Sequence, residues 1–542
     1  MSGTIRVPPP VNEPIFPYTP CSPERAELKA AVNEMSSQEV DIPVIIGGRE
    51  IRTGKTHEIH APHDHGLRLG LWHEGGAAEA RQAIADTLEA QREWASWPWE
   101  DRAAVFLRAA ELLSTTWRAR LNAATMLGQS KNAFQSEIDA ACEIIDFFRF
   151  GAHFAERVFS QQPHSEKGIW NRTDYRPLEG FVYAVSPFNF TAIGANLAGI
   201  PAMVGCAVLW KPSKHAVLSG YHTYRLLEEA GLPPGVINFV PGDPVEITAA
   251  ALEHRDFAGL HFTGSTEVFQ SLWTTVGRNI ASYRTYPRLV GETGGKDFIL
   301  AHPSGDSDAV RTAIVRGAFE YQGQKCSAAS RAYIPASMWK GMKDQLVAET
   351  DGLSMGDPAD FRNFVNAVID RGAFDSITGY IRRAKAGADA EVIAGGRYSD
   401  ADGFFIRPTI VHAKRPDHET MCDEIFGPVM SIHVYPDNAW SETLDIVDST
   451  SPYALTGAVF ARDRGAVREA MGRLRHAAGN FYINDKPTGA VVGQQPFGGG
   501  RASGTNDKAG SAANIARWLS PRSIKENLVP PTSYEYPFMA EE

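Results

Sequence analysis

The stretch FVYAVSPFNFTAIGANLAGIPAMVGCAVLWKP, Phe181–Pro212, contains two short runs of β-branched and aromatic residues, separated by a segment long enough for a helix, Thr191–Cys206. Comparable runs begin at Val236, Ala258 and Arg288, so that the successive starts lie 22 to 30 residues apart. Parallel strands need crossover connections of this length, whereas hairpins do not. The pattern therefore predicts a doubly wound α/β domain.

The chain on either side of this domain also shows regular patterns. Upstream, Val44–Pro62 alternates like a hairpin with a glycine turn. Three further stretches have apolar residues at helical spacing: Ala77–Trp94, Asp101–Leu121 and Ser136–Val158. Downstream, helix-like and strand-like segments alternate from about Asp306 to Asn484 and predict a second α/β domain. Residues 491–507 are too rich in glycine for regular structure and are interpreted as a functional loop.

The bulk composition argues against several classes of protein. The 542 residues carry a formal net charge of −11, whereas nucleic-acid and anionic-membrane surfaces need clustered Lys and Arg. No apolar run approaches the ~20 residues that span a bilayer, so we expect no membrane span. The five cysteines are scattered and form no C-x-x-C pair, so no metal site is predicted and a reducing cytoplasm fits best.

The N-terminal sequence MSGTIRVPPPVNEPIFPYTP, residues 1–20, is rich in proline. It has no apolar signal core, and its prolines would break the amphipathic helix of a mitochondrial transit peptide. We predict that residues 1–43 form an extended arm on the protein surface. A presequence that has been removed stays open as an alternative, and it would place a eukaryotic protein in the mitochondrial matrix.

The run FEYQGQKCSAASR, Phe319–Arg331, presents Cys326 just after a stretch of helical spacing, Asp306–Tyr321. Taken alone, a free cysteine is more often a buried, inert residue than a nucleophile. Small and polar neighbours form a poor shell for a core residue, however, and they indicate an accessible thiol. A thiol of pKa ~8.5 needs donors, a helix terminus or a base to ionise. The candidate base is Glu292 in VGETGGK, which taken alone fits a solvated turn residue equally well.

Two other strand ends carry residues that suit a nucleotide. FTGSTEVF, Phe262–Phe269, places a glycine and two hydroxyls at the start of a helix, where free N–H groups favour a phosphate. Ser265 fits a plain N-cap as well, and one glycine is a weaker signal than G-x-G-x-x-G. Lys211 in LWKPSK either bonds ribose hydroxyls or is a solvated strand end.

Seven motifs, in this order, resemble the aldehyde dehydrogenase superfamily from about Val44 onward: SPFNF, WKPS, FTGSTE, GETGGK, GQKCS, EIFGP and PFGGGRASG. More narrowly, IDFFRF, SPFNFTAIGANL and VGQQPFGGGRASGTNDKAG resemble the branch that oxidises L-glutamate γ-semialdehyde to glutamate in proline catabolism. The resemblance implies a Rossmann-type NAD domain over residues 44–291, with an oligomerisation hairpin near 160–180. It further implies a catalytic α/β domain over 292–487, then an anchor loop and an oligomerisation strand and tail over 488–542.

The resemblance also assigns roles to individual residues. It implies that Cys326 is the nucleophile, Glu292 the base that activates water and Asn189 an oxyanion donor. Five residues are implied to bind NAD: Ser186, Lys211, Gly264, Ser265 and Glu424. Six are implied to bind the substrate: Glu143, Phe190, Ser327, Gly489, Ala490 and Phe497. Two positions depart from the family pattern, since Phe269 replaces a common glycine and Ala490 a common serine.

Several alternatives stay open at this point. Another semialdehyde or an aliphatic aldehyde is a possible substrate, and a non-catalytic relative is disfavoured by the joint presence of Cys326, Glu292 and Asn189. Lys214 stands where many NAD-preferring relatives carry an acidic residue, which leaves NADP open. The resemblance implies a homodimer or dimer-based oligomer that uses a strand near Arg522–Val529. It leaves open whether a proline dehydrogenase passes on the substrate.

Overall fold

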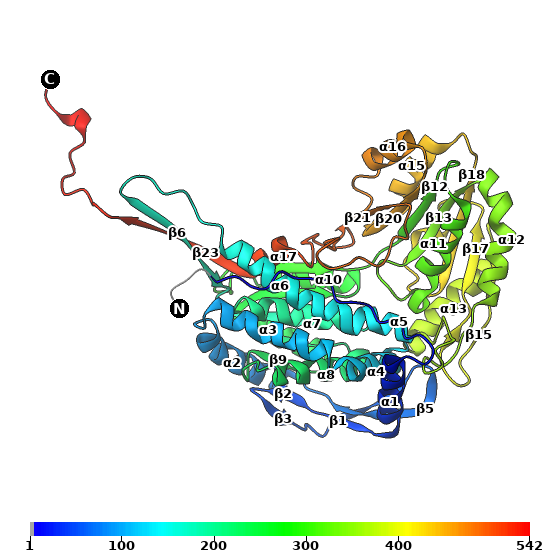
Figure 1. Ribbon diagram of the computed structural model, residues 1–542, viewed down its shortest axis with the longest axis horizontal. Coiled ribbons are helices and arrows are strands. Elements are labelled where there is room, and N and C mark those ends of the chain that lie inside the picture. Colours follow the sequence, from blue (N-terminus) through cyan, green and yellow to red (C-terminus); the bar gives the residue numbers. More distant parts are fainter. Residues whose placement is uncertain (1–4) are drawn as a thin grey trace.

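The computed structural model describes residues 5–542 and is built around two seven-stranded sheets (Figure 1). The strands of the first sheet, in spatial order, are β11 (Arg288–Glu292), β10 (Phe257–Thr263), β7 (Phe181–Val185), β8 (Ala207–Lys211), β9 (Ile237–Phe239), β2 (Val44–Ile46) and β3 (Arg49–Ile51). The strands from β11 to β9 run parallel, and the β2–β3 hairpin joins them antiparallel. All five predicted strand starts are confirmed to within one residue.

Helices cover both faces of this sheet. On one face lie α2 (Ala77–Trp94), α9 (Pro244–Glu253) and α10 (Thr266–Arg278). On the other lie α3 (Trp99–Ser114), α4 (Arg118–Gln129), α6 (Ile144–Phe159), α7 (Thr191–Met203) and α8 (Val217–Glu229). Alternate residues of each strand supply the two cores: Tyr183 and Leu209 face α2, whereas Ala184 and Trp210 face α7.

The second sheet has the same layered plan. Its strands, in spatial order, are β14 (Ala390–Ala394), β17 (Thr409–Ala413), β18 (Val429–Tyr435), β13 (Ala329–Pro335), β12 (Asp297–Ala301), β20 (Thr456–Phe460) and β21 (Asn480–Ile483). Only β14 pairs antiparallel. The helices packed on it are α11 (Ser307–Phe319), α12 (Ala336–Gly352), α13 (Arg371–Ala386), α15 (Trp440–Ser449) and α16 (Arg464–Arg473). The predicted α/β fold class is thus confirmed.

The chain also contains smaller elements. A three-stranded sheet contains β1 (Val40–Ile42), β5 (Asp64–His73) and β4 (Thr56–Ala61). The short helices are α5 (Ala133–Ser136), α14 (Glu419–Cys422) and α17 (Ala512–Arg517). None of the helices within residues 5–542 is long and apolar enough to cross a membrane. In the same part of the chain, no group of His, Cys, Asp and Glu side chains is arranged to hold a metal ion.

Three local predictions need correction. The segment before residue 44 is not extended throughout, because Ser22 caps a helix, α1 (Pro23–Ser37), that begins with proline at its first position. The helical stretch Asp101–Leu121 is broken between α3 and α4 at residues 115–117. The stretch Ser136–Val158 begins with a π-helical segment, Glu137–Glu143, before α6. Residues 1–4 of the predicted arm lie outside the described part.

A two-stranded ribbon extends from the body of the molecule (Figure 1, left). It pairs β6 (Ile169–Pro177) with β23 (Leu519–Asn527) antiparallel over nine residues. The hairpin predicted near residues 160–180 is therefore wrong, since β6 pairs with a strand from the other end of the chain. The tail beyond β23 is exposed within this chain.

Candidate active site

Two cavities lie side by side and share Cys326. The smaller has a volume of about 420 Å³ and the larger about 870 Å³. Three residues line both: Phe262 and Thr263 at the end of β10, and Cys326 between α11 and β13. Cys326 is therefore accessible from both cavities, which a buried core cysteine is not.

A strained turn presents Cys326 to both cavities. Tyr321, Gln322 and Gly323 have φ of 51°, 55° and 66°, which for the first two residues is an unfavourable left-handed conformation. The buried amide of Gln322 holds the turn by donating to two backbone carbonyls, at 3.0 and 2.8 Å, and accepting from a backbone N–H at 2.9 Å. The surrounding contacts thus fix the backbone that leads into Cys326.

The adjacent glycines Gly294 and Gly295 of GETGGK let other groups approach the segment around Cys326 closely. A Cβ on Gly295 would lie 2.1 Å from the carbonyl oxygen of Cys326, and one on Gly294 would lie 2.2 Å from a carboxylate oxygen of Glu424. Because neither residue carries a Cβ, the Gly295 N–H can donate to the Glu424 carboxylate, at 2.8 Å. These glycines therefore allow the Glu424 carboxylate and the Cys326 backbone to come close to the same turn.

Burial controls the protonation of the site. It raises the pKa of the Cys326 thiol well above its usual range, and three neighbouring carboxylates raise it further. Burial also raises the pKa of Glu292 well above its usual range, while a hydrogen bond from Gly499 at 3.3 Å and the charge of Lys508 act in the opposite direction. Both groups hold their protons more tightly than in water, and Glu292, once ionised, is a stronger base than an ordinary carboxylate.

Asn189 lies in the turn between β7 and α7, next to this centre. Its Nδ2 donates one hydrogen bond to the carbonyl of Gln324, at 3.0 Å. The start of α7 is held by Asp139, whose carboxylate accepts from the N–H groups of Thr191 and Ala192 at 3.0 and 2.9 Å. The buried amide is thereby fixed beside the cysteine, where it can donate to an oxyanion.

All five residues predicted to bind the cofactor line the larger cavity: Ser186, Lys211, Gly264, Ser265 and Glu424. Burial lowers the pKa of Lys211 to about 8 and raises that of Glu424 to about 7. The Ser265 hydroxyl accepts from the Val268 N–H at 3.4 Å and caps α10. The capping role proposed for Ser265 is therefore present, and Gly264 beside it faces the cavity.

Phe269 explains one departure from the family pattern. Its ring stacks on Phe262, with centroids 5.5 Å apart, and covers Gly291, where a Cβ would lie 2.2 Å from the Phe269 ring. The side chain is buried in the core of the first domain rather than in the larger cavity. At this position, where many relatives have glycine, the Phe269 side chain packs in the core. The lack of a side chain on Gly291 leaves room for its ring.

All six residues predicted to bind the substrate line the smaller cavity: Glu143, Phe190, Ser327, Gly489, Ala490 and Phe497. The Ser327 hydroxyl lies 2.9 Å from that of Thr488, which ties the cysteine segment to the start of the predicted anchor loop. The Lys131 ammonium lies 4.2 Å from the centroid of the Phe190 ring. The cavity therefore combines aromatic walls with polar groups at one end.

Glu143 has a different position from that expected of a surface helix residue. It ends the π-helical segment and lines the smaller cavity, and burial and then the charge of Asp139 raise its pKa to about 8. Sequence periodicity does not reveal this position, since one added residue in a helical turn changes the face on which the following side chains lie.

Sequence reasoning missed a group of residues in the N-terminal segment. Asn12, Glu13 and Ile15 line the smaller cavity, together with Asp146 of α6. Their segment has neither helical nor alternating apolar periodicity, and no local signal connects it to a site assembled from residues more than a hundred positions away.

Comparison with known proteins agrees with this architecture. A model of the aldehyde dehydrogenase family matches residues 50–524. The mitochondrial delta-1-pyrroline-5-carboxylate dehydrogenase of Dictyostelium discoideum is 52% identical over 536 residues, which cover 98% of this chain and 96% of that protein.

Solved structures resemble the chain over its full length. The Delta-pyrroline-5-carboxylate dehydrogenase of Mycobacterium tuberculosis, crystallised with NAD, is 52% identical and superposes with a TM-score of 0.97, covering 100% of both chains. Proline utilization A from Bdellovibrio bacteriovorus is 28% identical with a TM-score of 0.90, covering 97% of this chain and 54% of that one. The chain therefore belongs to the aldehyde dehydrogenase family.

Proposed function

We propose that this protein oxidises L-glutamate γ-semialdehyde, which is in equilibrium with Δ1-pyrroline-5-carboxylate, to L-glutamate, with NAD as the hydride acceptor. The observation that carries the proposal is the position of Cys326 on the boundary of two cavities, each lined by the residues expected for one of the two ligands. The relatives named for the same reaction, at about half identity over nearly the whole chain, support this choice of substrate.

The first chemical step forms a bond between the Cys326 Sγ and the aldehyde carbon. The thiol must first lose its proton, which its raised pKa makes costly without a base. As the carbonyl oxygen gains negative charge, the Asn189 amide and the Cys326 N–H would donate to it. One such donor contributes about 10²–10³ in rate. NAD, bound in the larger cavity, would accept the hydride that converts the thiohemiacetal to a thioester.

The second chemical step hydrolyses the thioester. Glu292 takes a proton from water, the resulting hydroxide attacks the acyl carbon, and the C–S bond breaks to give the carboxylic acid and the Cys326 thiolate. The acid then releases its remaining proton to solvent and becomes the carboxylate. The raised pKa of Glu292 suits this task, because a stronger base removes a proton from water more readily. The larger cavity would hold NAD through Lys211, Glu424 and the turn at Gly264.

Substrate selectivity is assigned to the smaller cavity. Gly489, Ala490 and Ser327 would bind the α-amino-carboxylate, and Phe190 and Phe497 would enclose the methylene chain. An aldehyde without the α-carboxylate leaves those polar groups unpaired, which costs binding free energy. Simple aldehydes should therefore be poor substrates.

Assembly and location are proposals of the same kind. The ribbon β6–β23 exposes one backbone edge of each strand, which suits pairing with another copy in a dimer or a dimer-based oligomer. The five free cysteines suit a reducing compartment, either the cytoplasm or, after removal of a presequence, the mitochondrial matrix. A proline dehydrogenase partner would supply the substrate.

Steady-state rates of NADH formation test the proposed function. We expect rapid turnover with Δ1-pyrroline-5-carboxylate and NAD, and kcat/KM at least about 10²-fold lower with propanal or hexanal. Parallel assays with NADP address the cofactor, because Lys214 lines the larger cavity. Equal activity with propanal would indicate a general aldehyde dehydrogenase, and a clear NADP preference would refute the cofactor assignment.

A further inference from the structure

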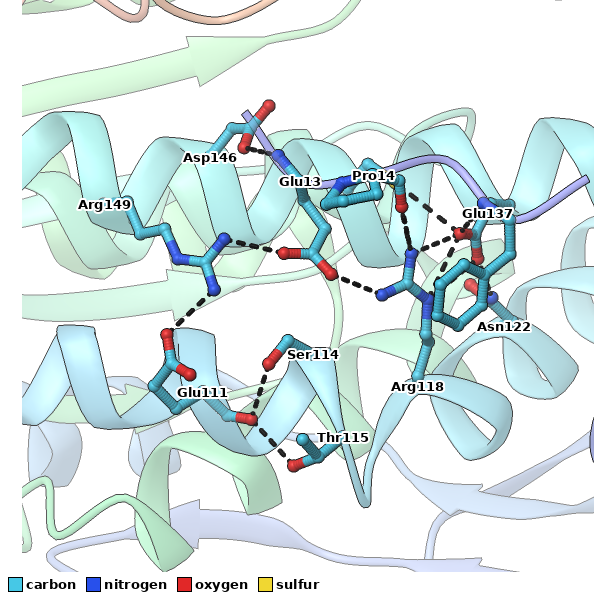
Figure 2. A network of polar contacts seen from close by, with 12 residues as sticks. Glu13, Pro14, Glu111, Ser114, Thr115, Arg118, Asn122, Glu137, Asp146 and Arg149 are labelled. Carbon is cyan, nitrogen blue, oxygen red and sulfur yellow. Dashed lines mark hydrogen bonds and ion pairs between the residues drawn. The ribbon is translucent and has the colours of Figure 1, made fainter. Parts of the chain in front are cut away.

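The N-terminal segment Asn12–Tyr18 is bound to the wall of the smaller cavity through a buried polar network (Figure 2). Glu13 accepts from Arg118 at 2.5 Å and from Arg149 at 2.7 Å, with its side chain only 8% exposed. Arg118 also donates to the carbonyl of Pro14, at 2.7 Å, and pairs with the fully buried Glu137. A buried network of this kind is costly to break, because each charge would lose its partner.

The rest of the segment is held on the same support. The backbone N–H of Phe16 and the hydroxyl of Tyr18 donate to the two oxygens of Glu137, at 2.8 and 2.7 Å. The Arg118 guanidinium lies 3.7 Å from the centroid of the Phe16 ring. The segment is therefore fixed to α4 and to the π-helical segment, and it is an integral wall of the cavity.

Asn12 connects this fixed segment to the predicted anchor loop. Its Nδ2 donates both to Asp146 of α6 and to the carbonyl of Val492, each at 2.8 Å, and its Oδ1 accepts from Gln494 at 2.9 Å. The side chain thus uses both of its donor hydrogens and its acceptor. The backbone N–H of Glu13 adds a bond to the second oxygen of Asp146, at 2.8 Å.

The loop is consequently held at two points. Its start is tied to the cysteine segment by the 2.9 Å contact between Thr488 and Ser327. Its far end, the turn 491–495, is closed by bonds from the backbone N–H groups of Gln494 and Gln495 to Val491, and is tied to Asn12. Gly489 and Ala490 lie between the two ties, with no side chain of their own able to form a polar contact.

We propose that Asn12 is a positioning residue that sets the loop Thr488–Gln495 for the α-amino-carboxylate of the substrate. This proposal rests on the proposed function, because it concerns recognition of that group. Backbone atoms of Gly489 and Ala490 can bind a carboxylate only if the loop is held in place, and Asn12 supplies the tie on the side away from Ser327. Asn12 acts through the loop and contributes no group to the reacting atoms.

Asn12→Ala removes the three side-chain bonds and leaves Glu13 and its network in place. We expect KM for glutamate semialdehyde to rise about tenfold, with kcat and KM for NAD changed less than about twofold. The affinity for L-glutamate, measured by calorimetry, should fall by a similar factor. The kcat/KM for propanal should change less than about twofold, because propanal has no α-carboxylate.

Arg6→Ala, upstream of this segment, is the matched control, since Arg6 makes only an exposed ion pair with Glu156. It should leave all five parameters unchanged. Gln494→Ala removes the tie from the loop side and should raise KM for the semialdehyde, while the double variant should be less impaired than the product of the two single effects. The Gln494→Ala variant provides the test if Asn12→Ala does not fold.

The outcomes separate the two proposals. An unchanged KM for the semialdehyde in both Asn12→Ala and Gln494→Ala would refute the positioning role. Equal losses with the semialdehyde and propanal would also refute it, by showing a general structural effect. A wild-type protein that is inactive with Δ1-pyrroline-5-carboxylate would instead refute the proposed function.

Discussion

The two cavities that meet at Cys326 are built in different ways. The larger cavity takes most of its predicted ligand-binding residues from the carboxyl ends of adjacent strands in one sheet, β7, β8 and β10. The smaller cavity is assembled from the N-terminal segment, the π-helical segment, the cysteine turn and the loop after β21. The larger cavity is therefore a direct product of sheet topology, whereas the smaller one depends on contacts between distant segments.

This difference in construction fits separate tasks for the larger and the smaller cavity. Strand ends of one sheet offer a constant geometry for the cofactor, which many reactions share. Loops and the N-terminal segment can vary without disturbing either sheet, which suits recognition of one substrate. Substitutions that affect one cavity and not the other test this division.

The largest expected effect is at the residue that both cavities share. Cys326→Ala should lower turnover by roughly 10⁴-fold, because the covalent route is lost, while NAD binding and the melting temperature change little. Cys422→Ser, which alters a thiol that lines neither cavity, is the control and should retain full activity. Retention of more than a few per cent of activity in Cys326→Ala would remove it as the nucleophile.

Glu292 lines only the smaller cavity, so its replacement should spare cofactor binding. Glu292→Gln should reduce steady-state turnover by about 10²–10³-fold because water is no longer deprotonated. Rapid mixing should still show a burst of NADH near one equivalent per site, with an acyl adduct on Cys326 detected by mass spectrometry. Absence of both burst and adduct would place Glu292 in the earlier step, as the base that ionises the thiol.

Glu424 lines only the larger cavity, and its effect should depend on pH. Because its pKa is raised to about 7, it is charged above that pH and neutral below it. A carboxylate accepts hydrogen bonds from ribose hydroxyls more strongly than a neutral acid does. KM for NAD should therefore rise about three- to tenfold as the pH falls from about 7.5 to about 6. Glu424→Gln should lose this dependence, and an unchanged profile in that variant would assign the titration elsewhere.

The smallest effect is expected at Ala490, in the loop of the smaller cavity. Ala490→Ser adds a hydroxyl able to donate to the substrate carboxylate, so KM for the semialdehyde should fall by about two- to threefold. KM values for NAD and for propanal serve as internal controls and should not change. A strong loss of kcat would mean that the loop presents this position away from the substrate.

The contrast also explains what could be predicted from sequence. The starts of β7, β8 and β10 and three candidate nucleotide residues at their ends, Lys211, Gly264 and Ser265, follow from local patterns, because each strand carries its own signal. Ser186 and Glu424 are implied by the resemblance alone. Glu143 was assigned by resemblance alone, since its π-helical position has no periodic signature. The β6–β23 pairing and the bonds between Asn12 and the loop residues Val492 and Gln494 link residues more than 300 positions apart, and no local pattern encodes such partners. Ser22 followed by Pro23 is a signal for the start of helix α1, but the many prolines before them favour an extended segment instead.

The contacts of Asn12 have a consequence for biosynthesis. Asn12 bonds to residues 480 and 482 positions later in the chain. At roughly 5–20 residues per second, a ribosome needs about 25 to 100 s to make the intervening chain. During this time the first domain can fold, but the N-terminal segment has no loop to dock against. The smaller cavity is therefore completed only after nearly the whole polypeptide has been translated, although part of its wall is formed by some of the first residues made.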